Sequence, residues 1–233
     1  MEKDYLTIKE NGVNEIDIKK SQFICSIARV SNEEEAMDFV NSVKEEHKKA
    51  THNCHAYVIG QDDSIQRASD NGEPSGTAGV PILEALKNIG VHNTAAVVTR
   101  YFGGIKLGAG GLIRAYSNAT TKAIEHVGIV KKILQTEITI DVAYNLFDQL
   151  NYHLEENGIN IIDTQYTDKV SVIVAIDNPK VEEFKQKVID LLNGRVEMYD
   201  GDEKYFEVDY DPYKKEWPNG HSFFSGYLYL CFL

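Results

Sequence analysis

The sequence has few cysteines and no long apolar run, and both scarcities exclude classes of protein. Its 233 residues include three widely spaced cysteines, Cys25, Cys54 and Cys231, and no CxxC pair. An odd number of isolated cysteines does not build a disulfide framework and predicts free thiols in a reducing compartment. The most apolar stretch, 223–233, is about half the roughly 20 residues that a membrane helix needs. The charged start, 1–9, lacks the apolar segment of a secretion signal, so we expect a cytoplasmic protein without a membrane partner.

Positive charge is also scarce, with 24 lysines and arginines against 36 aspartates and glutamates, which gives a net charge of −12. Such a chain repels phosphates over most of its surface, so any contact with RNA has to come from a local basic patch. The 42% of apolar and 26% of charged residues are typical of globular proteins and are enough to bury a core. The length suits one large domain or two small ones.

The first half of the chain predicts a mixture of strands and helices. Apolar residues at every second position, or in short unbroken runs, indicate strands at 15–18, 23–30, 56–59 and 95–99. Ser31 followed by Glu34 fits a capping box, which predicts a helix directly after it. Pro81 is expected to open a second helix. A third helix carries an apolar stripe over 112–127 and is expected to end at Gly128.

The second half predicts the order β-α-β-β-α-β, which is that of a ferredoxin-like domain. Strands are indicated at 138–142, 159–166, 170–176 and 195–199, and helices begin at Asn145 and at Asn178-Pro179. The expected boundary at 130–134 gives an N-terminal domain at 1–134, a ferredoxin-like domain at 135–211 and an aromatic-rich tail at 212–233. This tail either packs as an added strand, pairs with another chain in an oligomer, or stays disordered.

Glycine is concentrated in one part of the chain, because nine of the 17 glycines lie between residues 67 and 114. Eight of these nine form two clusters, at 67–79 and 100–111, and each cluster leads into a predicted helix. Glycine permits positive φ, so exposed N–H groups can surround an anion beside a helix N-terminus. Residues 67–114 have a net charge of +2, which leaves −14 to the rest of the chain. This glycine-rich island predicts phosphate binding; the alternative is that its glycines only form tight turns between packed elements.

Two long runs in this island resemble the signature of a known family. They are SDNGEPSGTAGVP at 69–81 and RYFGGIKLGAGGLIRAY at 100–116, in this order. Both resemble the IMPACT family, including its bacterial YigZ-type branch, and the resemblance covers about residues 15–130. One departure is Asn71, where the family often has Asp, and it weighs against a mechanism that needs adjacent carboxylates.

The resemblance implies an α+β protein of two domains. The first would be similar to the second domain of ribosomal protein S5, and the second would resemble the last domain of elongation factor G. Both comparisons point to ribosomes or RNA, and eukaryotic members regulate the translational response to starvation through a protein partner. The chain is therefore predicted to be a translation-linked protein that binds RNA or the ribosome, without catalysis and without a cofactor; a protein partner also stays open.

The motif match nominates ten residues for contact with RNA or phosphate: Arg67, Gly76, Arg100, Tyr101, Gly103, Gly104, Lys106, Gly110, Gly111 and Arg114. Arg100 and Arg114 are expected to pair with phosphates, because a guanidinium can donate two parallel hydrogen bonds to one phosphate. Tyr101 and Phe102 are expected to offer a stacking face for an exposed base. They point to opposite sides of an extended chain, so at least one of them is expected to belong to the core.

Two other functions remain open. In an enzyme acting on a nucleotide or a phosphorylated metabolite, Asp70 or Glu73 would serve as acid or base. The loop around Lys106 does not follow the Walker A pattern, because no Ser or Thr follows the lysine. The same two carboxylates would otherwise hold the loops together through ion pairs with Arg67 or Arg100. The other open function is that of a pure protein-interaction module.

His52, Cys54 and His55 suggest a metal site but do not complete one. On a strand, His52 and Cys54 share a face while His55 points away, and no fourth ligand has a typical spacing. A nucleophilic Cys54 with His52 as its base lacks a third group to orient the base. We therefore expect no metal. The acidic segment 200–211 is predicted to be a solvated turn and strand edge, with a cation site as the alternative.

Overall fold

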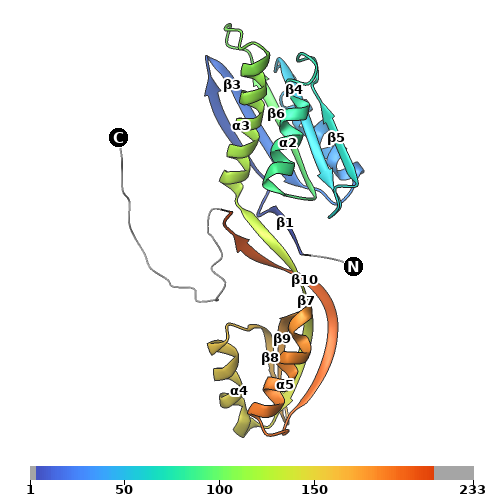
Figure 1. Cartoon of the computed structure of the whole chain (residues 1–233), viewed down its shortest axis with the longest axis vertical. Helices are drawn as coiled ribbons and strands as arrows, with labels where there is room; N and C mark the ends of the chain where they lie inside the picture. The colour runs from blue at the N-terminus through green and yellow to red at the C-terminus, as the bar shows by residue number, and fades with distance from the viewer. Residues whose placement is uncertain (1–3, 213–233) are drawn as a thin grey trace, which may run out of the picture.

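The computed structural model describes residues 4–212 as a mixed α/β structure built on two five-stranded sheets (Figure 1). The first sheet has the order β2-β3-β6-β4-β5, and all its neighbouring strands are antiparallel. Its strands are β2 (Gly12–Ile18), β3 (Ser21–Arg29), β4 (His52–Ile59), β5 (Ile65–Ser69) and β6 (Thr94–Tyr101). Three helices pack on it, α1 (Glu33–Glu46), α2 (Gly79–Ile89) and α3 (Ala109–Val127). We call this sheet with its helices the first unit.

Both faces of the first sheet are covered, which explains the continuous apolar run in β6. Cys25, Cys54 and Val98 point to the face under α2 and α3, which lie side by side, and share one buried cluster (Figure 1). Tyr57 and Val97 point to the other face, which packs against α1. Because side chains alternate along a strand, a strand covered on both sides has no polar face.

The helix ends follow the predicted chemistry with small displacements. The cap of α1 is Asn32, whose Oδ1 accepts a hydrogen bond from the Glu35 N–H at 2.9 Å. In return, the Glu35 carboxylate accepts from the Ser31 N–H at 2.8 Å. The predicted capping box of Ser31 and Glu34 is therefore wrong by one residue, because Asn caps as well as Ser and also has a glutamate three positions later. The predicted end of α3 at Gly128 is confirmed.

The second sheet has the order β1-β7-β9-β8, and β10 pairs with the other edge of β7. Its strands are β1 (Tyr5–Ile8), β7 (Ile129–Val142), β8 (Asn160–Tyr166), β9 (Val170–Asp177) and β10 (Glu197–Tyr210). With α4 (Tyr144–Glu156) and α5 (Val181–Leu191), they follow the predicted order β-α-β-β-α-β. The cap of α4 is Ala143, not the predicted Asn145. Ile140, Leu150 and Val172 belong to the core between sheet and helices, and we call this part the second unit.

A long two-stranded ribbon of β7 and β10 joins the two units (Figure 1). β7 runs unbroken through 130–134, so the boundary predicted there falls inside a strand. The acidic segment 200–211 forms a largely exposed edge strand as far as Tyr210, as predicted, but not the predicted turn, because β10 stays paired with β7 with one register shift between Asp200 and Glu203. Over 129–136 the apolar and polar residues of β7 come in pairs and do not alternate, so the sequence does not indicate a strand that passes from one unit to the other.

The ends of the ribbon belong to the core of the first unit. Ile8 of β1 and Ile129 of β7 pair with each other and lie in the first unit's buried cluster, against which Tyr210 also packs. The predicted aromatic tail, 212–233, lies outside the described residues apart from Pro212. Among the helices formed by residues 4–212, none has both the length and the apolar character of a membrane span.

Candidate functional site

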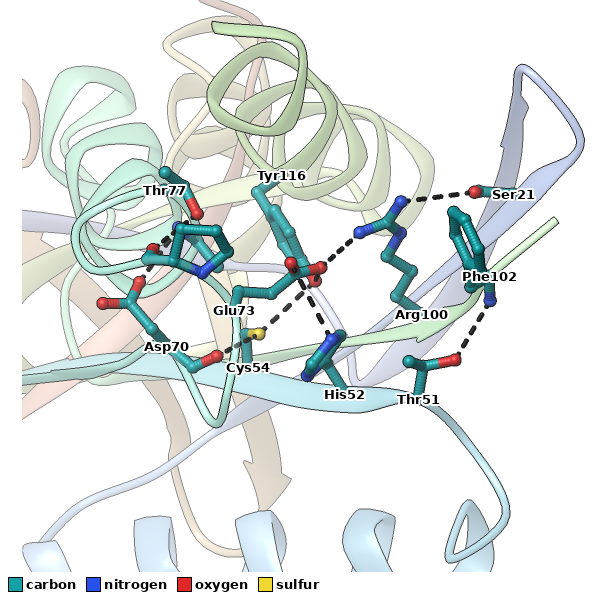
Figure 2. Close-up of polar contacts among 12 residues, drawn as sticks. Ser21, Thr51, His52, Cys54, Asp70, Glu73, Thr77, Arg100, Phe102 and Tyr116 are labelled. Atoms are coloured by element: carbon teal, nitrogen blue, oxygen red, sulfur yellow. Dashed lines mark hydrogen bonds and ion pairs between the residues drawn. The ribbon is translucent and has the colours of Figure 1, made fainter. Parts of the chain in front are cut away.

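A buried ion pair lies at the centre of the glycine-rich island. Arg100, near the end of β6, places Nη1 2.6 Å from Oε1 of Glu73, which lies in the loop between β5 and α2 (Figure 2). The two side chains are 6% and 4% exposed. The Tyr116 hydroxyl, from α3, donates to the same carboxylate oxygen at 2.9 Å. Charges buried to this degree are stable only when polar or charged partners surround them. Here the partners come from β6, from α3 and from the loop between β5 and α2.

His52 and Cys54 of β4 lie beside this ion pair (Figure 2). His52 Nε2 is 3.8 Å from Oε2 of Glu73, and its Nδ1 is 3.0 Å from the carbonyl oxygen of Asn71. The Cys54 sulfur lies 2.9 Å from the carbonyl oxygen of Asp70. Burial raises the pKa of the Cys54 thiol to about 12, so the group stays protonated near neutral pH. The arrangement therefore does not support the cysteine nucleophile considered from the sequence.

Asp70 closes the loop that carries Glu73 back onto the start of α2. Its carboxylate accepts hydrogen bonds from the backbone N–H groups of Gly76, Ala78 and Gly79, at 2.8, 3.0 and 2.8 Å. Ala78, at the N-cap position, has no side chain able to do this, so Asp70 caps the helix from outside it. Burial acts to raise the pKa of Asp70, but these three hydrogen bonds outweigh it and lower that pKa.

The same contacts explain the first glycine cluster. A Cβ at Gly79 would lie 2.5 Å from the backbone nitrogen of Ser69, so only glycine lets the two segments touch. Gly76 has a φ of +75°, and its N–H is bound by Asp70 rather than exposed to an anion. The Gly76 N–H is therefore already occupied by Asp70, and the geometry of this cluster supports the alternative of tight turns between packed elements.

Three further nominated residues are also engaged elsewhere. The Arg100 guanidinium is buried against Glu73, so it cannot grip a phosphate as predicted. Arg67 lies on the edge strand β5 and pairs with Glu33 of α1 at 3.3 Å, which puts the sheet between it and α3. The Tyr101 hydroxyl bonds to His47, so this ring does not form an open stacking face. The four predicted arginines and lysines of the island therefore do not converge.

Asp70 and Glu73 are likewise committed to structural contacts. All the N–H groups that Asp70 binds belong to its own loop and to α2, and Glu73 is enclosed by Arg100 and Tyr116. Neither carboxylate can exchange a proton with a substrate without breaking these bonds. Of the two roles considered from the sequence, the structure therefore supports the ion pair, which Glu73 forms with Arg100. Among residues 4–212, no group of three or more His, Cys, Asp or Glu side chains is placed to hold a metal ion.

The second glycine cluster lies against the turn between β2 and β3. Gly103 donates its N–H to Ser21 Oγ at 3.2 Å, and a Cβ there would overlap the carbonyl oxygen of Lys20. This contact pins the 102–108 loop to the turn that carries Lys19 and Lys20. Sequence reasoning missed both lysines, although the predicted strands at 15–18 and 23–30 leave only four residues between them, which is short enough for a hairpin turn.

A groove of about 720 Å³ runs between this turn and the first turns of α3. Lys19, Leu107, Ile113 and Arg114 line it, and no acidic side chain does. We call it the cationic groove. Gly104 has a φ of +86° in the adjoining loop, while Gly110 and Gly111 form the uncapped first turn of α3 beside Arg114.

We expect Glu73→Gln to destabilise the protein by about 3–5 kcal/mol, because it leaves the Arg100 guanidinium buried without an anion. Chemical denaturation followed by circular dichroism measures this. Glu125→Gln is the matched control, since it breaks the exposed pair with Lys122 and is expected to cost at most about 1 kcal/mol. Combining Glu73→Gln with Arg100→Met should cost less than the sum of the two; additive losses would contradict a coupled pair.

We expect Asp70→Asn to lower the free energy of unfolding at neutral pH by about 1–2 kcal/mol, through loss of the charged cap of α2. Because the pKa of Asp70 is lowered in the folded state from its ordinary 3.8, its stabilisation is complete above that value. It is lost as the pH falls through the lowered pKa. The difference in stability between native protein and Asp70→Asn should thus shrink in acid. A difference that stays constant with pH would count against the cap. So would an equal loss of stability in Asp38→Asn, which changes an exposed position of α1.

Comparison with known proteins gives the relationship of the chain. The family model described as the Impact N-terminal domain matches residues 19–124, and a domain of unknown function (DUF1949) matches residues 140–195. IMPACT family member YvyE of Bacillus subtilis (strain 168) is 44% identical over 203 residues, 87% of this chain and 94% of that protein. IMPACT family member YigZ of Escherichia coli (strain K12) is 39% identical over 184 residues, 78% of this chain and 90% of that protein.

One solved structure, described only as a hypothetical protein, is similar over most of both chains. The alignment covers 85% of this chain and 97% of the other, with a TM-score of 0.55 and 36% identity. This likeness supports the mixed α/β architecture, and the relatives confirm the resemblance of the two motif runs. The chain belongs to the IMPACT family.

Proposed function

We propose that this protein is a cytoplasmic, non-catalytic regulator linked to translation, which binds RNA phosphate, free or on the ribosome, through the cationic groove and its rim. One observation carries this proposal. Lys19 and Arg114 line the groove, Lys20 contacts Gly103 of the adjoining loop, and Lys106 directly precedes the groove residue Leu107. Within residues 4–212 none of these four cations makes an ion pair. Unpaired cations beside a groove without acids attract a polyanion.

The conformation of the turn supports a role for its lysines. Lys19 and Lys20 have φ of +46° and +66°, and they form a two-residue hairpin turn between Ile18 and Ser21. Asn and Gly are the residues that adopt such a turn without strain, whereas lysine costs on the order of 1 kcal/mol at each position. Folding alone does not favour two lysines here, and their charge supplies a reason for their presence.

The backbone of α3 adds to the positive potential. Its first turn has no side-chain cap, so the N–H groups near Gly110 and Gly111 have no partner inside the helix. The aligned peptide dipoles place about half a positive charge at this end of α3. The chain as a whole carries −12, so attraction is confined to this end of the first unit and does not extend to non-specific binding over the surface.

Family membership supports the link to translation. The resemblance described above relates the chain to eukaryotic regulators of translation, and the sheet order β10-β7-β9-β8 is consistent with a ferredoxin-like second unit. We infer on the same basis that the first unit is similar to the second domain of ribosomal protein S5. An enzyme acting on a nucleotide receives less support, because Asp70 and Glu73 are both committed to structural contacts.

The test measures binding of a fluorescent oligoribonucleotide by anisotropy over a range of salt concentrations. If four phosphates are contacted, the logarithm of the association constant should fall with the logarithm of salt with a slope of about −3. The variant with Lys19, Lys20, Lys106 and Arg114 replaced by alanine should bind at least about tenfold more weakly, with a slope close to zero.

The matched control replaces Lys48, Lys49, Lys87 and Lys187 by alanine, which removes the same charge from exposed positions away from the groove. It should bind RNA as the native protein does, apart from a small general effect of net charge. Equal loss in both variants, or binding that does not respond to salt, would show that the groove is not the site.

A further inference from the structure

The chain segment that leads into the cationic groove carries large exposed apolar side chains as well as a lysine. Phe102, Ile105 and Ile113 are 45%, 42% and 43% exposed, and Leu107 and Ile113 line the groove. All four belong to one stretch of the chain, 102–113, which also contains Lys106. Binding to the phosphates of a duplex requires cations alone, because the bases of a duplex are stacked inside it. The apolar side chains therefore call for a ligand with exposed bases.

Phe102 is held rigidly although it is exposed. Its backbone N–H donates to Thr51 Oγ1 at 3.1 Å (Figure 2). The next residue, Gly103, donates its own N–H to Ser21. The carbon at the centre of the Arg100 guanidinium lies 5.3 Å from the centre of the Phe102 ring. With one ring face over the guanidinium, the exposed part of Phe102 includes the other face. A ring fixed in this way loses little conformational entropy when a base stacks on it.

The buried ion pair thus has a second consequence. Arg100 lies between two rings, with Phe23 at 5.4 Å on the core side and Phe102 on the outside. It cannot swing out toward a phosphate, because Glu73 holds it. Arg100 therefore acts as a positioning residue that supports the Phe102 ring, and it does not touch the ligand. Tyr101 points to the other side of the chain, which leaves Phe102 as the stacking residue.

The stacking face and the cations lie along one continuous surface. Gly103, directly after Phe102, touches the carbonyl of Lys20. Lys19, the residue before Lys20, lines the groove together with Leu107 and Arg114. A strand with one base on Phe102 would therefore find cations on both the turn side and the α3 side, with apolar surface between them for the neighbouring base or ribose. Alternation of aromatic and cationic groups is the usual composition of a single-strand binding surface.

We propose that the cationic groove binds single-stranded RNA, with one base stacked on the outer face of Phe102 and the flanking phosphates on Lys19, Lys20, Lys106 and Arg114. This inference rests on the proposed function and specifies its ligand. It predicts that binding depends on an aromatic ring at position 102 independently of charge. It also predicts that duplex RNA of the same length binds more weakly, because a duplex offers no base for the ring.

The test compares a labelled single-stranded oligouridylate of about 12 nucleotides with an RNA duplex of the same length. Phe102→Leu should weaken binding of the single strand about tenfold and leave its salt dependence unchanged, since an apolar side chain remains but stacking is lost. Phe102→Trp should bind at least as tightly as the native protein. Duplex binding should be the same for all three proteins. Val13→Leu, at an exposed position on β2, is the control for an apolar substitution elsewhere.

A second measurement does not depend on the folding of a variant. Ultraviolet cross-linking of the native protein to an oligonucleotide containing 4-thiouridine, followed by mass spectrometry of peptides, should place the cross-link within 101–114 or within 18–21. A cross-link outside these two segments would overturn the inference. So would equal affinity of Phe102→Leu and native protein, or a duplex bound as tightly as the single strand.

The outcomes separate this inference from the proposed function. If salt-dependent RNA binding is lost in the four-cation variant but Phe102→Leu binds normally, the groove binds phosphate without stacking and only this inference fails. If no RNA binds, both fail. Tighter binding of anionic lipid vesicles or of polyglutamate than of the single strand would also overturn it, because the apolar and cationic groups would then serve a membrane or an acidic protein.

Discussion

The buried ion pair between Arg100 and Glu73 is the constraint on which the first unit depends. It joins the end of β6 to the loop between β5 and α2, and Tyr116 of α3 donates to the same carboxylate oxygen. Because an isolated charge in a core is very unfavourable, the three elements have to meet at this point. Glu73 is thereby fixed in the middle of its loop, and Asp70 at the start of that loop reaches the N-terminus of α2.

The ion pair also determines which residues of the glycine-rich island face solvent. Arg100 is withdrawn into the core, and Phe102 covers it from outside. The loop that follows is pinned to the turn between β2 and β3 by the contact of Gly103 with Ser21. Lys20, far from the island in sequence, is in this way brought against Gly103, and Lys19 comes to line the same groove as Arg114. The surface proposed to bind RNA is thus a product of packing between segments about 80 residues apart.

The two units are joined by paired strands and not by a linker. The Arg29 guanidinium donates two hydrogen bonds to the Glu207 carboxylate, at 2.7 and 2.9 Å, and these bonds, the largest cause, hold the pKa of Glu207 below its ordinary value. The same guanidinium also binds the backbone carbonyl of Ile8. Arg29 of the first unit therefore binds both β1 and β10. These bonds fix where the ribbon leaves the first sheet.

The sequence by itself determined what depends on local periodicity and on motif identity. The strands of both sheets other than β1 and β5, the order β-α-β-β-α-β and the glycine end of α3 at Gly128 follow from patterns within about a dozen residues. The two long motif runs were sufficient to identify the family. The local pattern of 129–142 and 197–210 did not mark the ribbon, because apolar and polar residues come in pairs over 129–136 and residues 200–204 are all charged or glycine.

Only the tertiary structure decided which charged groups are available to a ligand. The sequence alone does not distinguish the cations Arg67, Arg100, Lys106 and Arg114 from one another. In the structure, Arg100 is neutralised by Glu73 inside the core, and Arg67 lies across the sheet from α3. Lys19 and Lys20 gained their place through the hairpin that brings them to the groove. The physical reason is that the availability of a charge depends on burial and on the nearest opposite charge, and both are set by contacts between residues distant in sequence.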